Sequence, residues 1–169
     1  MPLLKKLHAT VYLGVENAAI ENHGKGKIHF NVMNEERADM MSSRRAVEIL
    51  HEYDIPMRLS FVFGDPGETK ETLAENLEII VGMVEKHATI SDLELNPIEV
   101  LPGTQAFRDL MRLKGEKYKE KEVPYDTLEM SKDLVPLVTK VTREEVLKTI
   151  KDIYHAVRRI KPSIRVNTK

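Results

Sequence analysis

The chain contains no cysteine and no tryptophan among its 169 residues. Without a thiol it forms no disulfide. It also supplies neither a zinc–thiolate site nor the ligands of a cysteine-bound iron–sulfur cluster. The absence of cysteine fits a reducing compartment, and we expect a cytoplasmic protein.

An excess of one charge and a long apolar run are lacking as well. The formal net charge is −1, which predicts neither a nucleic-acid partner nor a membrane partner. No apolar run reaches the roughly 18 residues of a transmembrane helix, and the start of the chain lacks a signal-peptide core. At 169 residues, we expect about one domain with a sizeable core.

Short apolar segments of strand type alternate with segments of helical period. We expect strands at Thr10–Val15, Met57–Phe63 and Leu93–Asn96. Helices are expected from Asn34 with a break at Ser42–Ser43, from Thr69, and after Thr104. Each crossover is long enough to require parallel pairing, so the fold class is α/β with three parallel strands followed by C-terminal helices.

We expect the C-terminal third to be a helical extension. A charged linker is expected at 114–125, a short helix at Asp126–Leu134, and a long helix opened by a capping box at Thr142 and Glu145. Pro162 should end that helix. This divides the chain into residues 1–113, 114–125 and 126–169.

The stretch Leu59–Thr69 is the centre of this arrangement. Its first half is a buried strand, and Gly64-Asp65-Pro66-Gly67 then forms a turn that leads into a helix. Loops that follow parallel strands are where α/β proteins place their ligands.

Three segments together carry a family likeness. They are Tyr12-Leu13-Gly14-Val15-Glu16, then Ser60 to Thr69, then Leu95-Asn96-Pro97 with Pro102-Gly103-Thr104 after it. In this order and spacing they resemble the second half of the radical S-adenosylmethionine (radical SAM) catalytic domain. The likeness is to members with a cobalamin-binding domain or to the methylthiotransferase group. It covers Thr10 to Leu113.

The resemblance implies half of a partial (β/α)6 barrel, with this chain holding strands four to six. The absent half would carry a Cys-x3-Cys-x2-Cys loop for a [4Fe–4S] cluster that cleaves S-adenosylmethionine. The implied cofactor is therefore S-adenosylmethionine, while the cluster belongs to the family and is not bound by this chain. The sequence departs from the family in having no cysteine and in reading Glu16-Asn17-Ala18 at the first loop.

The resemblance also nominates site residues at the carboxyl ends of the strands. The acid that ends the family's fourth strand lies near the ribose or methionine, and backbone groups of the fifth and sixth strands receive the adenine. Carried over, these cofactor-binding positions are Glu16, Val62, Phe63, Gly64, Leu95 and Asn96.

Each nominated position has a structural alternative. Glu16 could be a solvated loop acid, and Asn96 a cap before Pro97. Gly64 and Gly67 could serve turn geometry alone, because glycine takes positive φ at little cost. For Glu68, stabilisation of the helix start by the dipole is the favoured interpretation.

The remaining polar groups give weaker signals. His23 and His29 lie in a glycine-containing loop, and their spacing fits no standard metal site. His51 and His87 stand near helix ends, where we expect favourable dipole partners. The basic residues from Lys148 to Lys169 have no interleaved aromatic platform, so we expect no nucleic-acid binding.

Two functions of different classes remain. The first is a C-terminal radical SAM fragment that shapes the S-adenosylmethionine pocket and is inactive without its cluster-binding half. The second is a non-catalytic half-barrel. A thin sheet with unpaired edges and an apolar barrel interior open to water would pair with a second copy or with the missing half.

Overall fold

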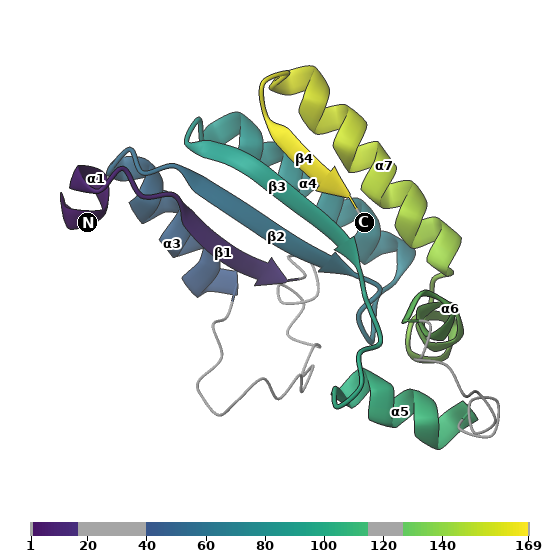
Figure 1. The fold of residues 1–169 in the computed structure, drawn as a ribbon. Coiled ribbons are helices and arrows are strands. Elements are labelled where there is room, and N and C mark those ends of the chain that lie inside the picture. Colours follow the sequence, from purple (N-terminus) through teal and green to yellow (C-terminus); the bar gives the residue numbers. More distant parts are fainter. Residues whose placement is uncertain (1, 17–39, 115–126, 169) are drawn as a thin grey trace.

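The described residues form a four-stranded parallel sheet with helices packed on one face (Figure 1). The structure is a computed structural model that describes residues 2–16, 40–114 and 127–168. The strands lie in the order β1-β2-β3-β4. Their bounds are β1 Val11–Glu16, β2 Met57–Phe63, β3 Ile90–Pro97 and β4 Arg165–Thr168. The α/β class is therefore confirmed.

The core lies between the sheet and the helices α3 (Met40–Glu52), α4 (Lys70–Lys86) and α7 (Arg143–Ile160). Alternate residues of β2 point into it, and Met57, Leu59 and Phe61 are at most 1% exposed. The residues between them lie toward the other face, because successive side chains of a strand point to opposite faces. Burial of this apolar row explains why the Met57–Phe63 strand was predicted with its observed bounds.

A fourth strand corrects the expected count of three. β4 pairs in parallel with β3, and Leu93 lies beside Val166 in the register. Three of its four residues are polar, so the segment carries no strand pattern. The Nε of Arg165 lies 3.2 Å from the Asp92 carboxylate of β3, and long-range pairing of this kind is invisible in a local pattern.

Several helix expectations changed in detail. α3 runs through Ser42–Ser43 without the expected break. α6 (Thr127–Val138) continues past Leu134 although Pro136 lies inside it. β3 begins three residues before Leu93. The helix after Thr104 is confirmed as α5 (Gln105–Lys114), and a short α1 (Pro2–Lys6) precedes β1.

α7 follows the sequence prediction closely. The side chain of Thr142 accepts the Glu145 N–H, and the Glu145 carboxylate accepts the Thr142 N–H, which is a complete capping box. At the other end, Lys161 Nζ donates to the carbonyls of Ala88 at 2.6 Å and Ile90 at 2.7 Å. Lys161 therefore ties the end of α7 to the start of β3.

Some predictions fall outside the described residues. The glycine-containing loop with His23 and His29 lies there, and so does nearly all of the charged linker. In the described part the sheet is open, since β1 and β4 form its two edges. Closure into a barrel stays a prediction.

Candidate functional site

The turn between β2 and α4 stands at the carboxyl edge of the sheet, as the sequence indicated. Gly64 and Gly67 have φ angles of +93° and +91°, which side-chain-bearing residues adopt only with strain. Thr69 then caps α4, and its side chain and that of Thr72 form a reciprocal capping box. The turn is thus fixed at both ends by local chemistry.

Glu68 holds this turn from inside. Its side chain is completely buried, and its carboxylate accepts hydrogen bonds from the Gly64 N–H and from the Asn76 amide, the latter at 3.3 Å. The predicted role was an acid at a helix start stabilised by the dipole. The carboxylate instead turns back onto the turn, so Glu68 positions the turn that follows β2.

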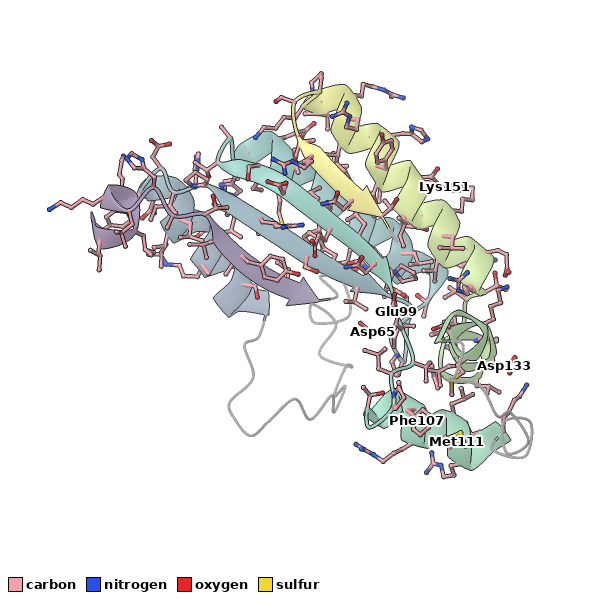
Figure 2. The ribbon with its side chains drawn as sticks, viewed as in Figure 1. Asp65, Glu99, Phe107, Met111, Asp133 and Lys151 are labelled. Atoms are coloured by element: carbon pink, nitrogen blue, oxygen red, sulfur yellow. The ribbon has the colours of Figure 1, made fainter. Side chains whose placement is uncertain are left out.

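The turn is also covered by the end of α6 and the residues after it. The Gly67 N–H donates to the Val138 carbonyl at 2.9 Å, and the Lys140 N–H donates to the Glu68 carbonyl at 2.8 Å. Figure 2 labels Asp65 of this turn and Glu99 of the loop after β3, both at the carboxyl edge of the sheet. Asp65 is 4% exposed, so the first part of the turn is packed into the core, whereas Gly67 is exposed.

Gly64 serves packing more than ligand approach. A Cβ added there would lie 3.0 Å from Ile98 Cγ2 and 3.2 Å from Val135 Cγ2. The open side of the turn is at Gly67, where an added Cβ meets nothing within 4 Å. The turn-geometry interpretation of Gly64 is therefore supported by contacts with α6 and the loop after β3.

The structure brings Val62 and Asn96 together. They are register partners on β2 and β3, and both are half-buried on the face away from the helices. Phe63 and Leu95 are buried toward the helix layer, at 1% and 0% exposure. A ligand on the open face would therefore contact the side chains of Val62 and Asn96 but only the backbone of Phe63 and Leu95.

Two nominated backbone groups are already engaged. The Phe63 carbonyl accepts the Ile98 N–H at 2.7 Å, and the Gly64 N–H donates to Glu68. Glu16 is the last residue of β1 and pairs with Phe61, after a register shift that follows Gly14. Its side chain lies outside what the structure describes, so its predicted ligand contact stays a prediction.

The open face of the sheet is polar, and this corrects the expected apolar interior. The Tyr12 hydroxyl donates to Glu94 Oε2 at 2.9 Å, and Arg58 forms an ion pair with the same carboxylate. The Arg58 guanidinium also lies 5.8 Å from the centre of the Tyr12 ring. Asp92 and Arg165 form a second pair beside them. Paired charges are stable against water, so this face does not demand a partner to cover it.

The residues fit the two implied cofactors differently. A cysteine-bound [4Fe–4S] cluster does not fit, because the chain has no cysteine. Across the described ranges, no group of three or more histidine and acidic side chains is placed to hold a metal ion. S-adenosylmethionine fits in part, since the Asn96 amide and the Val62 side chain offer one polar and one apolar contact at the carboxyl edge of the sheet.

His51 and His87 form an edge-to-face pair with ring centres 4.9 Å apart. His87 caps the end of α4 and is 5% exposed, and its Nδ1 has no hydrogen-bond partner among the described residues. Burial lowers the pKa of His87, and the nearby His51 and Lys86 lower it further. His87 stands at the C-terminal end of α4 as predicted, and its buried environment favours the neutral ring, so the predicted dipole partnership stays a prediction.

Several basic side chains near the C-terminus have defined partners. Lys148 pairs with Asp152 at 2.8 Å, and Arg158 donates to the Ile164 carbonyl at 2.8 Å. Arg165 pairs with Asp92, and Lys161 binds two backbone carbonyls. Lys148–Asp152 lies within α7, and the other contacts hold α7 and β4 to the sheet.

A shallow groove of about 400 Å³ lies elsewhere, between the first halves of α4 and α7. Its floor includes Leu73 and Leu77. Lys70 pairs across it with Glu145 at 2.7 Å, and this hydrogen bond lowers the pKa of the Glu145 carboxyl. Lys148 pairs in the same way with Asp152, so four of the five charged side chains that line the groove are paired, and the carboxyl edge of the sheet remains the better candidate site.

Comparison with known proteins adds no relative. A scan against protein-family models finds no match, and a search of curated proteins finds no similar sequence. None of the helices in the described residues is long and apolar enough to cross a membrane.

Proposed function

We propose that this chain is the C-terminal half of a radical SAM catalytic barrel and forms one wall of its S-adenosylmethionine pocket. The observation that carries the proposal is the pairing of Val62 with Asn96 at the carboxyl edge of a parallel sheet, directly before a buried, fixed turn. Ligands of α/β folds bind outside the carboxyl ends of strands. The three sequence segments that resemble the family all end at this edge.

In this proposal the chain binds and orients but does not generate the radical. The Asn96 amide would hydrogen-bond a ring edge of the adenine, and Val62 would pack against its apolar face. Bound S-adenosylmethionine supplies a 5′-deoxyadenosyl radical only when it is reduced by an iron–sulfur cluster. This chain has no cysteine to hold that cluster, so the missing half-barrel is the implied partner. We place the protein in the cytoplasm, with neither membrane nor nucleic acid as partner.

Calorimetry with S-adenosylmethionine tests the binding part. We expect weak binding, because half of the pocket is absent, and a several-fold loss of affinity for Asn96→Ala. Asn167→Ala is the matched control, since Asn167 is exposed on β4 and lies beside Glu94 in the register. Absence of binding at millimolar ligand, or equal affinity in both variants, would overturn the proposed site.

Chemistry is tested separately. The chain is incubated with iron, sulfide, a strong reductant and S-adenosylmethionine, and 5′-deoxyadenosine is measured. We expect no product from this chain alone. Product formation would contradict the proposal, because it would require a cluster held without cysteine. A Cys-x3-Cys-x2-Cys motif encoded upstream of the chain would support the proposed parentage.

A second candidate is a non-catalytic half-barrel that binds another polypeptide. The specific observation in its favour is β1, whose outer side has no strand partner in the described part of the chain. Association through the open face was expected because an apolar interior would be exposed to water. That face is polar, so this reason no longer applies. Association through the β1 edge remains.

A further inference from the structure

The outer side of β1 is defined by two residues. The Val11 N–H donates to the Pro56 carbonyl at 3.0 Å, so the backbone groups of Val11 face β2. Because successive residues of a strand direct their N–H and C=O groups to opposite sides, those of Tyr12 and Gly14 point away from β2. Among the described residues no strand meets them.

The side chains of β1 are incompletely covered on both faces. Leu13 and Val11 are half-buried on the helix side, whereas their β2 register partners Leu59 and Met57 are fully buried. On the open face Tyr12 is 55% exposed and Gly14 is exposed. The edge therefore offers an apolar row on one face and an aromatic beside a glycine on the other.

This pattern is complementary to itself. In an antiparallel pair with its two-fold axis at Leu13, Val11 lies opposite Val15 of the second copy, and Leu13 lies opposite Leu13. Tyr12 then lies opposite Gly14 in both halves, so no two bulky side chains face each other on the open face. The free backbone groups of Tyr12 and Gly14 form the hydrogen-bonded pairs of this register.

We propose that two copies of this chain associate through β1, antiparallel and centred on Leu13, to form one continuous eight-stranded sheet. The register shift after Gly14 leaves the stretch Tyr12–Gly14 regular. At the other edge, β4 is short, and exposed Arg165 and Asn167 oppose pairing there.

The proposal does not rest on the likeness to radical SAM enzymes, and it concerns this chain without the missing half-barrel, whose third strand would pair at the same edge of β1. Light scattering of the purified chain at micromolar concentration should give twice the chain mass. A monomer over the whole concentration range would overturn the proposal, and would leave S-adenosylmethionine binding untouched.

Cysteine substitution tests the register, because the chain has no cysteine of its own. Leu13→Cys at the axis should form an intermolecular disulfide under mild oxidation. Facing Cβ atoms of such a pair lie about 4.5–5.5 Å apart, close to disulfide range. Val11→Cys should not crosslink to itself but should crosslink to Val15→Cys when the two are mixed. Self-crosslinking of Val11→Cys with none at Leu13→Cys would overturn the register.

Gly14→Pro tests the edge itself. It removes an outward N–H and leaves the bonds from Val11 and Leu13 to β2, so the variant should be a folded monomer by circular dichroism and light scattering. Thr168→Pro on the β4 edge is the matched control, because the register and alternation direct its N–H away from β3, and it should remain a dimer. Dimerisation of Gly14→Pro to the same extent as the control would contradict the proposal. Should Gly14→Pro fail to fold, the cysteine variants decide the question.

Discussion

The Glu68 carboxylate accepts the backbone N–H of Gly64, four residues earlier, inside a turn where both residues are buried. The same carboxylate accepts the Asn76 amide from the second turn of α4. One buried acid thus connects the end of β2 with α4 and fixes the turn between them. Stability measurements should detect this connection.

Replacement of Glu68 by Gln should destabilise the protein by about 1–3 kcal/mol, because an amide group cannot accept from both N–H donors as a carboxylate does. Urea unfolding followed by circular dichroism measures the change. Glu85→Gln is the control, since Glu85 is exposed on the same helix and should change the free energy of unfolding little. Equal effects of the two substitutions would contradict the positioning role of Glu68.

The two glycines of the turn separate backbone strain from packing. Gly67→Ala should cost about 1–2 kcal/mol, because its φ is +91° and the added methyl group meets nothing. Gly64→Ala should cost about 1–3 kcal/mol more, since its Cβ would press on Ile98 and Val135. The difference between the two unfolding free energies measures the packing term. A difference near zero between the two unfolding free energies would mean that α6 moves to accommodate the new methyl group at Gly64.

Local sequence rules predicted most of the elements but little of what joins them. β2 and the capping box at Thr142 follow from alternation and from one polar pair, which are both local signals. β4 was missed because its stability comes from pairing with β3 and from Arg165 beside Asp92, contacts that span more than seventy residues. Such contacts leave no trace in a short window of sequence.

The site shows the same limit. The predicted strand ends placed Val62 and Asn96 correctly at one edge of the sheet, because the carboxyl ends of parallel strands meet at the same edge. The role of Glu68 was missed because a glutamate before a helix has an ordinary dipole explanation. The complete burial of Glu68 would have indicated its role. A local pattern does not reveal that burial, because it depends on α6, which lies far along the chain.

His87 should make stability depend on pH. Its folded-state pKa is lowered by burial and by His51 and Lys86, so the folded protein binds fewer protons than the unfolded chain as pH falls below about 6.5. The stabilisation is full above that pH and is lost as pH decreases through the unfolded-state value and then the folded-state value. Urea unfolding between about pH 5 and pH 8 measures this slope.

His87→Leu should flatten that dependence, because the apolar side chain has no proton to bind. His155→Gln, on an exposed position of α7, should leave the slope unchanged and serves as the control. An unchanged slope in His87→Leu would show that another group carries the acid sensitivity.

Lys161 joins two elements that are distant in the sequence, and its replacement should separate them. Lys161→Met keeps most of the aliphatic stem but removes the ammonium group that donates to the Ala88 and Ile90 carbonyls at 2.6 and 2.7 Å. We expect a loss of about 1–3 kcal/mol in the free energy of unfolding. Lys151→Met is the matched control, because Lys151 is exposed on the same helix (Figure 2). Hydrogen exchange should also become faster at the start of β3 in Lys161→Met but not in the control. Unchanged protection there, with unchanged stability, would mean that α7 is held to the sheet by its apolar face alone.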